Sequence, residues 1–326
     1  MRECLLFCDQ DTLEATYLRE FISEGRVPQN LFYLLNGATV FYSYRNEDIE
    51  QIAWEDEVRF FSEQGICGPG DRVAFVSLGC GNAGPEKMLL RKLAADGCDL
   101  HYVGVDSSAG MLDLATENLD GESYRQSFVL ADFSAPDFGE RLDAVIAGAD
   151  TRVYAMIGGT FGNFDQDFIA DLLASLTPKG SHFYLDVVPT EPTEGRNEEL
   201  EHRLSHLPQN LGDFFDRLLG ALGLSREVGE VIRQDRTDGD LRTMRFTFAF
   251  RVTQCVHLAC LGMERVLNPG EVVELFTVRA YDPESLVTFL GRRGFSLVDT
   301  YEPDVGGLSH RWQRLLLEKN GVVPQT

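Results

Sequence analysis

The stretch VAFVSLGCGNAGPEKMLL, from Val73 to Leu90, changes character twice. It begins as an apolar run typical of a buried strand, breaks into glycines, and resumes with the spacing of an amphipathic helix. The glycines are Gly79, Gly81 and Gly84, which form a GxGxxG pattern. Glycine permits a tight turn and lets a ligand come close to the backbone. The stretch therefore predicts a strand, a turn and a helix that bind an anionic or nucleoside-like ligand.

The alternation of strand and helix continues on the C-terminal side of this turn, as far as the segment SHFYLDVV. Five such β–α steps with apolar strands predict a parallel sheet covered by helices on both faces. Beyond residue 282, a helix that begins at Asp282-Pro283 leads into two further strands, FSLVDTYE and HRWQRLLLEK. The predicted fold class is therefore α/β, a Rossmann-like sheet that ends on an antiparallel hairpin.

Four regions follow from these patterns. Residues 1–70 read mainly as helices, residues 71–190 as the Rossmann-like core, residues 191–281 as an inserted α+β cap, and residues 282–326 as the final helix and hairpin. Residues 243–281 alternate between apolar and polar side chains, which is typical of antiparallel strands. Insertions at this edge of an open α/β sheet can cover the carboxyl ends of the strands, where such sheets bind ligands. We therefore expect residues 1–70 and the insertion to contribute to the substrate site.

The composition favours a small-molecule partner. The 29 basic and 52 acidic residues give a formal net charge of −23. A field of this sign repels the phosphates of nucleic acids and an anionic membrane surface, so neither is an expected partner. No apolar stretch reaches the length of a membrane span, and no signal peptide precedes the first elements. The expected location is the cytoplasm, and the oligomeric state is left open.

The cysteines indicate free thiols. Seven cysteines are scattered along the chain without a CxxC pair, as expected of a protein in a reducing compartment. Cys255, His257 and Cys260 lie close together in the apolar run VTQCVHLACL, where they read as core residues of a strand. No metal site is predicted.

Two aspartates distinguish among the possible ligands of the glycine turn. A triphosphate loop would need GxxxxGK[ST], which is absent. Asp106 ends the second strand, where its carboxylate can accept hydrogen bonds from the ribose of a dinucleotide or of S-adenosylmethionine. Asp132 ends the third strand, where a carboxylate can meet an adenine amine and Phe133 can flank the ring; the alternative is that Asp132 closes a local turn. Because a third-strand carboxylate has no fixed role in the dinucleotide fingerprint, the pattern favours S-adenosylmethionine.

Several motifs give the chain a family resemblance. It resembles the histidine-specific methyltransferases, whose fold is the class I methyltransferase sheet. Their best-known members trimethylate the α-amine of histidine, and relatives methylate the amine of a prenylated tryptophan. The resemblance runs from about residue 28 to the C-terminus. It is carried by RVYAMIGGTFGNFD, FYLLNGATVF, PEK, ADF, YLDVV and YDPESLVTFLGRRGF.

The resemblance implies roles for individual residues. Asn163 would hold the carboxylate and amine of an amino acid, and Tyr33 would line the acceptor site. An amide can donate to a carboxylate and accept from an amine. The alternative for Asn163 is a helix N-cap or a left-handed turn. The expected cofactor contacts are Gly79, Gly81, Gly84, Lys87, Asp106, Ser107, Asp132, Phe133 and Gly158.

The chain also departs from the family. Ser77 stands where methyltransferases commonly have an acidic residue, and Phe276 and Val278 stand where the family grips imidazole, with Glu274 two residues early. We therefore predict N-methylation of a small amino compound, an amino acid or its derivative, rather than of histidine. The alternatives are O- or C-methylation of a small metabolite, a non-catalytic S-adenosylmethionine-binding protein, and a dinucleotide oxidoreductase.

Overall fold

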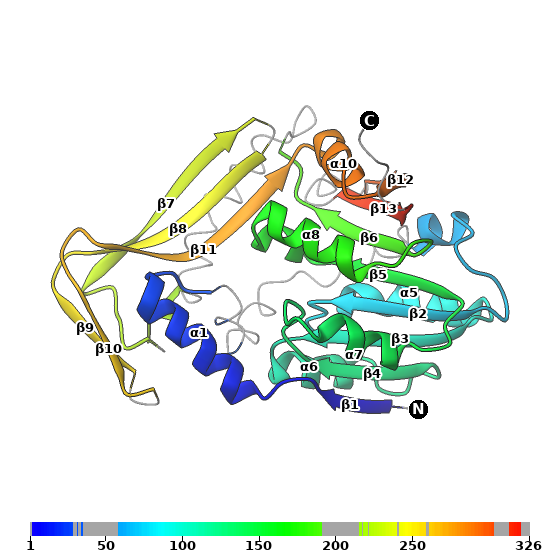
Figure 1. The fold of residues 1–326 in the computed structure, drawn as a ribbon, viewed down its shortest axis with the longest axis horizontal. Helices are drawn as coiled ribbons and strands as arrows, with labels where there is room; N and C mark the ends of the chain where they lie inside the picture. Colours follow the sequence, from blue (N-terminus) through cyan, green and yellow to red (C-terminus); the bar gives the residue numbers. More distant parts are fainter. Residues whose placement is uncertain are drawn as a thin grey trace. The chain divides into compact units, whose positions relative to one another are not determined.

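An eight-stranded sheet forms the centre of the fold in the computed structural model. Its strand order is β1-β4-β3-β2-β5-β6-β13-β12 (Figure 1). The first six strands in this order are parallel to one another, and β13 is antiparallel to both of its neighbours. The structure describes residues 2–28, 31, 34, 58–190, 215–216, 218–220, 222–239, 241–258, 261–302 and 313–320.

The strands of this sheet coincide with the apolar segments of the sequence. Side chains of the central strands are buried almost throughout, because helices pack on both faces and leave no side for water. The sheet strands are β1 (Arg2–Leu6), β2 (Arg72–Leu78), β3 (Asp99–Asp106), β4 (Arg125–Leu130), β5 (Thr151–Met156), β6 (His182–Val187), β12 (Phe295–Tyr301) and β13 (Gln313–Lys319).

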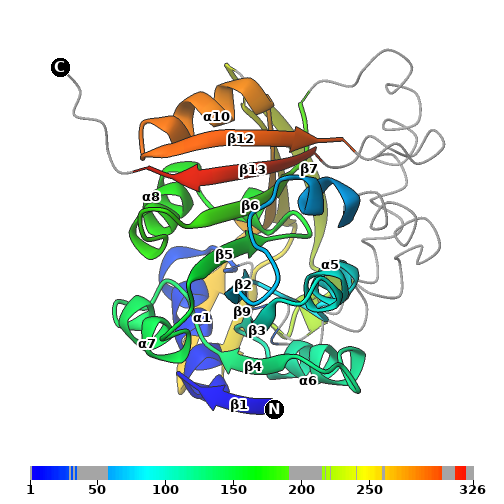
Figure 2. The same cartoon turned by 90° about the vertical axis from the view of Figure 1, so that its right-hand side faces the viewer.

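Helices cover the two faces of this sheet, as Figure 2 shows for α5 and α6 on one side and α7 and α8 on the other. The predicted α/β fold class is therefore confirmed. The helices are α5 (Gly84–Ala95), α6 (Ala109–Asn118), α7 (Phe138–Val145), α8 (Gln166–Leu176) and α10 (Pro283–Gly291), and a short 3-10 helix, η2 (Thr160–Asn163), precedes α8.

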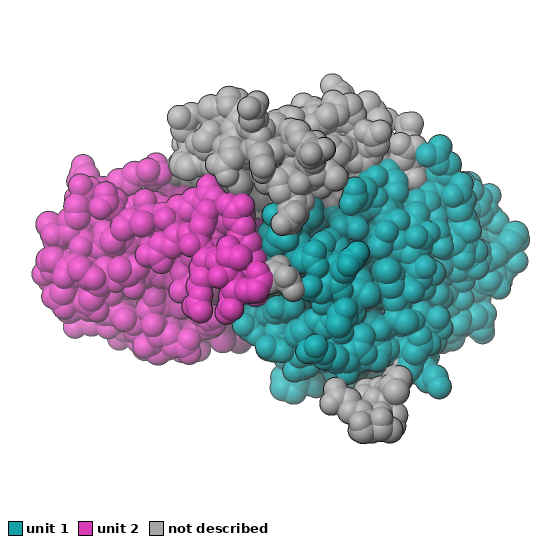
Figure 3. Space-filling model, turned by 90° about the horizontal axis from the view of Figure 1, so that it is seen from above, with its two compact units in different colours: residues 1–8, 46–191, 280–326 teal, residues 9–45, 192–279 magenta. Residues whose placement is uncertain are grey.

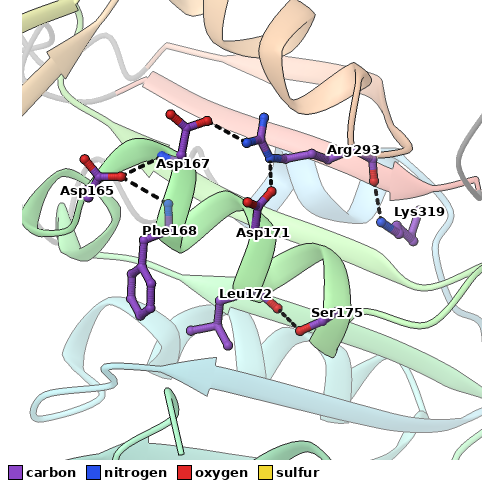
Figure 4. Close-up of polar contacts among 8 residues, drawn as sticks. All are labelled: Asp165, Asp167, Phe168, Asp171, Leu172, Ser175, Arg293 and Lys319. Atoms are coloured by element: carbon purple, nitrogen blue, oxygen red, sulfur yellow. Dashed lines mark hydrogen bonds and ion pairs between the residues drawn. The ribbon is translucent and has the colours of Figure 1, made fainter. Parts of the chain in front are cut away.

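The sheet ends on the expected antiparallel hairpin, which is tied to α8. Arg293, in the turn after α10, donates to Asp171 at 2.6 Å and to Asp167 at 2.7 Å (Figure 4). Its guanidinium also lies 4.0 Å from the centroid of the Phe289 ring. The Lys319 amine donates to the carbonyl of Arg293 and lies over the ring of Phe295. The last helix and strands are thus fixed to the helix that follows η2.

The N-terminus differs from the expectation of helices across residues 1–70. Residues 2–6 form β1, which extends the sheet as a parallel neighbour of β4. Glu3 accepts hydrogen bonds from Ser127 at 2.6 Å and Arg125 at 2.8 Å, both on β4. The hydrophobic pattern of RECLL is too short to reveal a strand whose partner lies more than a hundred residues away. The helix that follows, α1 (Gln10–Glu24), agrees with the sequence pattern.

The chain divides into two compact units, coloured separately in Figure 3. Unit 1 comprises Met1–Cys8, Asn46–Glu191 and Ala280–Thr326, and contains the eight-stranded sheet. Unit 2 comprises Asp9–Arg45 and Pro192–Arg279. The segment after β1 therefore belongs to the same unit as the insertion, although the sequence suggested two separate regions.

Unit 2 is built on antiparallel strands, as the alternation over residues 243–281 predicted. Its strands are β7 (Gly229–Asp238), β8 (Leu241–Phe250), β9 (Gln254–Leu258), β10 (Met263–Leu267) and β11 (Val272–Tyr281), of which the last two residues of β11 fall in unit 1. The strand order is β11-β8-β7, and β9 and β10 form a separate hairpin. Arg265 of that hairpin donates to the carbonyl of Ile22 at 2.8 Å, which fixes α1 to the insertion.

The prediction that Cys255 and His257 are core residues is wrong. Both side chains are exposed on β9, whereas Val256 and Leu258 between and beyond them are buried. Cys260 lies outside the described residues. In the part of the chain that the structure describes, no group of three His, Cys, Asp or Glu side chains could hold a metal ion.

Candidate active site

The glycine turn after β2 has the conformation that its sequence predicts. Gly79 and Gly81 take left-handed φ angles of 72° and 53°. The N–H groups of Gly79 and Cys80 donate to the carbonyl of Val105 at 2.8 and 3.0 Å, which fixes the turn to the end of β3. Gly84 is the first residue of α5, and its N–H donates to the Asn82 side chain at 2.9 Å. The turn is therefore held by hydrogen bonds at the point where strand passes into helix.

Asp106 lies beside this turn at the end of β3. One carboxylate oxygen accepts the N–H of Gly81 at 3.0 Å, and the other accepts the N–H of Ser108 at 2.9 Å. Burial raises the pKa of Asp106 to about 6, and hydrogen bonds from the backbone of Ser108, Gly81 and Ser107 act in the opposite direction. Each oxygen has a second lone pair, so the carboxylate can also accept hydrogen bonds from ribose hydroxyls.

A second carboxylate lies behind the turn. Ser77, at the position where an acidic residue was expected, is fully buried on β2, and its hydroxyl is hydrogen-bonded to Glu86. Glu86 belongs to the first turn of α5 and is only 1% exposed. The strand therefore lacks the acid, but the helix brings a carboxylate to the same serine.

The Lys87 amine is hydrogen-bonded to Asn118. It donates to the carbonyl and to the side-chain oxygen of Asn118 at 2.6 and 3.1 Å, at the C-terminus of α6. A cation at this end of a helix is favourable, because the last carbonyls are negative. Asn118 in turn donates to the carbonyl of Asn82, in the turn. Lys87 thus supports the turn through Asn118, and its contact with the cofactor stays a prediction.

At the end of β4, Asp132 and Phe133 contact different residues. One Asp132 oxygen accepts the N–H and the hydroxyl of Ser134 at 2.8 and 2.5 Å, so Asp132 closes the local turn that the sequence offered as its alternative duty. The adenine contact stays a prediction. Phe133 is 7% exposed and packs against the ring of Phe164, with the centroids 5.4 Å apart.

A second glycine turn follows β5. Gly158 and Gly159 take left-handed φ angles of 87° and 78°. Their N–H groups donate to the two carboxylate oxygens of Asp186, each at 2.7 Å. Asp186 lies on β6 and is buried together with Arg314 of β13, which donates to it at 2.9 Å. Gly158, expected to contact the cofactor, therefore has its N–H on a protein carboxylate.

The structure brings the two glycine turns together. A Cβ placed on Gly79 would come within 2.8 Å of the Thr160 methyl carbon, so the backbone of the first turn lies against the start of η2. Asn163 is the last residue of η2 and is half-buried. The N-cap of α8 is Asp165, whose side chain accepts the N–H groups of Asp167 and Phe168 (Figure 4).

Neither local duty considered for Asn163 applies to it. Asp165 caps the helix, and among the described residues other than glycine only Ala83 has a positive φ angle. Tyr33 lies outside the described residues. Phe276 and Val278 are half-buried on β11 in unit 2.

Sequence reasoning missed Asp186 and Arg314. Asp186 is the carboxylate of YLDVV near the end of β6, the same kind of position that singled out Asp106 and Asp132. That position was a usable signal. Arg314 could not have been found, because its partner is set by the pairing of β13 with β6.

The residues present suit S-adenosylmethionine. The first turn is built on two half-buried left-handed glycines, and the buried Asp106 carboxylate can take the ribose hydroxyls. The mostly parallel sheet with the antiparallel β13 near one edge agrees with the class I methyltransferase fold that the sequence resemblance implied.

Residues 22–183 match the family model described as histidine-specific methyltransferase, S-adenosylmethionine-dependent. The chain belongs to this family and is a methyltransferase that uses S-adenosylmethionine. No curated protein matches the chain.

Solved structures of methyltransferases are similar to the chain at low sequence identity. A S-adenosylmethionine-dependent methyltransferase from Clostridium acetobutylicum ATCC 824 is 12% identical with a TM-score of 0.43, covering 86% of this chain and 95% of that one. The 1,6-didemethyltoxoflavin-N1-methyltransferase of Burkholderia thailandensis is 10% identical with a TM-score of 0.44, covering 95% and 88%. The glycopeptide N-methyltransferase MtfA is 15% identical with a TM-score of 0.41, covering 82% and 87%. Similarity at this level does not define a substrate.

Proposed function

We propose that the protein N-methylates a small amino compound, an amino acid or amino-acid derivative with an apolar or aromatic side chain. The single observation that carries this proposal is the approach of the two glycine turns, with Thr160 against Gly79 and Asn163 three residues further on. This arrangement supports the proposal, because Asn163 belongs to the short helix whose first residue lies against the turn that is expected to hold the cofactor.

The proposed chemistry asks little covalent help from the protein. When bound, S-adenosylmethionine supplies an electrophilic methyl group and leaves as S-adenosylhomocysteine. The acceptor nitrogen must be uncharged to form the new bond, and its surplus proton passes to water afterwards. Asn163 would hold the acceptor by accepting from its amine and donating to its carboxylate. Rate enhancement then comes mainly from proximity, alignment and exclusion of water.

The acceptor preference rests on the sequence, in which Phe276 and Val278 stand where the family resemblance implies the residues that grip imidazole. Phe276 and Val278 have no group that can hydrogen-bond to an imidazole. Glu274, on the same face of the strand, forms an ion pair with Arg245 at 3.2 Å and accepts the hydroxyl of Thr277 at 2.8 Å. The Glu274 carboxylate therefore already has two partners within unit 2.

Replacement of Asn163 tests the proposed acceptor role. Asn163→Ala should raise the acceptor KM by about tenfold to a hundredfold, because a hydrogen bond to a charged group is lost. The Kd of S-adenosylhomocysteine, measured by calorimetry, should change by less than about twofold. Ser175→Ala is the matched control, since it removes one hydrogen bond, to the carbonyl of Leu172, on the exposed face of α8 (Figure 4). Equal loss of cofactor and acceptor binding would give Asn163 a structural role instead.

Product analysis separates the competing chemistries. Phenylalanine, tyrosine, tryptophan and histidine are incubated with methyl-labelled S-adenosylmethionine, and the products are fragmented in a mass spectrometer. Label on the α-nitrogen of an aromatic amino acid supports the proposal, and label on oxygen or carbon contradicts it. Efficient trimethylation of histidine would restore the family's best-known activity. Binding of S-adenosylhomocysteine with no turnover of any acceptor would indicate a non-catalytic protein.

The proposed setting is the cytoplasm, with neither nucleic acid nor membrane as a partner. The net charge of −23 and the free thiols of the described cysteines support it. None of the helices in the described ranges has the length and apolarity of a membrane span.

A further inference from the structure

Asp186 lies at the centre of a buried polar cluster with Gly158, Gly159 and Arg314. It is 1% exposed and accepts hydrogen bonds from the N–H groups of Gly158 and Gly159 and from Arg314. Arg314 is itself 4% exposed. Buried charges are stable only when they are paired and hydrogen-bonded, so each of these two side chains depends on the other.

The conformation of the two glycines follows from this cluster. Successive left-handed residues turn neighbouring N–H groups toward one point, a concave arrangement that attracts an anion. Here the anion is a carboxylate of the chain itself, with one oxygen for each glycine. These N–H groups are already occupied, so the turn acts through its shape rather than by binding a ligand directly.

The shape of the turn determines where the next residues lie. Gly159 leads directly into η2, which begins at Thr160 beside Gly79 and ends at Asn163. A carboxylate that fixes Gly158 and Gly159 therefore fixes the starting point of the segment that carries Asn163.

The cluster also connects this segment to the end of the chain. Arg314 lies directly opposite Asp186 in the antiparallel pairing of β13 with β6. Arg293, which precedes β12, holds α8 on the other side of η2 through Asp167 and Asp171 (Figure 4). Two arginines of the C-terminal segment thus act on the two ends of the segment from Gly158 to Asn163. Arg314 acts on its start through Asp186, and Arg293 holds the helix that follows it.

We propose that Asp186 is a positioning residue for the methyl acceptor. It fixes the turn of Gly158 and Gly159 so that Asn163 meets the acceptor, and Arg314 holds Asp186 in place. This inference rests on the proposed function, because it takes Asn163 as the acceptor contact.

The test compares Asp186→Asn with the double variant Asp186→Asn/Arg314→Gln. The single variant leaves Arg314 opposite a neutral amide, and the double variant removes that charge so that folding does not decide the result. Asp143→Asn is the control, because it neutralises an exposed aspartate that also pairs with an arginine, Arg152. Three quantities are measured: amide exchange of residues 157–164, the Kd of S-adenosylhomocysteine, and the KM and kcat for the aromatic amino acid that the wild type methylates.

In both Asp186 variants, the amides of Gly158 and Gly159 should exchange at least about tenfold faster, since their acceptor is weakened. The acceptor KM should rise about tenfold while the Kd of S-adenosylhomocysteine changes less than about threefold. The single variant Arg314→Lys keeps a cation opposite Asp186, so its acceptor KM should stay close to that of the wild type.

Unchanged exchange at Gly158 and Gly159, or equal losses of cofactor and acceptor binding, would overturn the inference. Failure of the proposed function has a different signature. In that case Asn163→Ala leaves acceptor use intact, or no amino acid is methylated. Faster exchange in the Asp186 variants then still shows that Asp186 fixes the turn. Where an acceptor is methylated, an unchanged acceptor KM in these variants overturns the link to Asn163.

Discussion

Each of the two glycine turns of unit 1 is held by an aspartate on the neighbouring strand, but the two aspartates differ in whether a positive charge is paired with them. The turn after β2 is held by Asp106 on the neighbouring β3, and the turn after β5 by Asp186 on the neighbouring β6. Asp186 is paired with a buried arginine. In the part of the chain that the structure describes, no arginine or lysine pairs with Asp106, and burial raises its pKa to about 6.

This difference indicates which turn is ready for a ligand. A carboxylate with a full set of protein partners, including a cation, gains little from a further donor. A buried carboxylate held only by backbone N–H groups is less well stabilised and gains from added hydroxyl donors. We infer that the first turn binds the cofactor and that the second turn positions the segment that carries Asn163.

The largest expected effect is on stability. Asp186→Ala should lower the free energy of unfolding by about 3–5 kcal/mol, because it leaves Arg314 buried without its counter-charge. Asp106→Ala should cost less than about half of that, since relief from burying a carboxylate offsets the lost hydrogen bonds. Urea unfolding followed by circular dichroism measures both. Equal losses in the free energy of unfolding would mean that the two aspartates contribute equally to stability and do not differ as inferred.

The next effect is on cofactor binding, where the order of the two turns should reverse. Asp106→Ala should weaken S-adenosylhomocysteine by about tenfold to a hundredfold, because the ribose hydroxyls lose a charged acceptor. Calorimetry gives the Kd, and Asp150→Ala, at an exposed ion pair with Arg72, serves as control. NAD and ATP should not raise the melting temperature, whereas S-adenosylhomocysteine should. An unchanged Kd in Asp106→Ala would remove the ribose assignment.

The glycines themselves should respond unequally. Gly158→Ala places a Cβ in open space and should cost only the left-handed strain, about 1–2 kcal/mol. Gly79→Ala carries the same strain and also brings its Cβ to 2.8 Å from Thr160. It should therefore cost more stability and also weaken S-adenosylhomocysteine. The double variant with Thr160→Ser removes the clashing methyl group and should recover part of the difference. No recovery would show that Thr160 is not the obstacle.

The smallest effect is a pH dependence that belongs to one turn alone. Ribose hydroxyls donate to an ionised carboxylate, so binding favours the deprotonated form of Asp106, whose pKa in the free protein is about 6. Affinity for S-adenosylhomocysteine should be full above pH 6 and fall by at most about tenfold for each pH unit below it. Titrations between pH 5 and 8 measure this slope. Asp106→Asn should bind more weakly but without the slope, and a flat wild-type profile would contradict the proposed contact.

Much of unit 1 could be predicted because its signals are local. The apolar strands, the amphipathic helices and the glycine turn from Gly79 to Gly84 each depend on neighbouring residues, and all appear where the periodicity placed them. The position of Asp106 at the end of its strand could be predicted as well, but its hydrogen bonds to Gly81 and Ser108 came from the structure, and its contact with ribose stays a prediction.

Other features depended on partners far away in the chain. Lys87 carried the right chemistry for an anionic ligand, yet its amine lies on Asn118, thirty-one residues away. Cys255 and His257 read as core residues because they sit in an apolar run, but alternation along β9 turns both outward. Periodicity gives the spacing of the two faces of a strand, and only packing decides which face is buried.

The sequence by itself determined the α/β sheet, the terminal hairpin and the glycine turn after β2, since these follow from periodicity and glycine geometry over short distances. Only the tertiary structure decided that residues 2–6 extend the sheet beside β4, that α1 joins the insertion in unit 2, and that Asp186 and Arg314 fix the turn before Asn163. The physical reason is the same in each case. Strand pairing and buried ion pairs are satisfied between residues more than a hundred positions apart, and no local pattern records which partner is chosen.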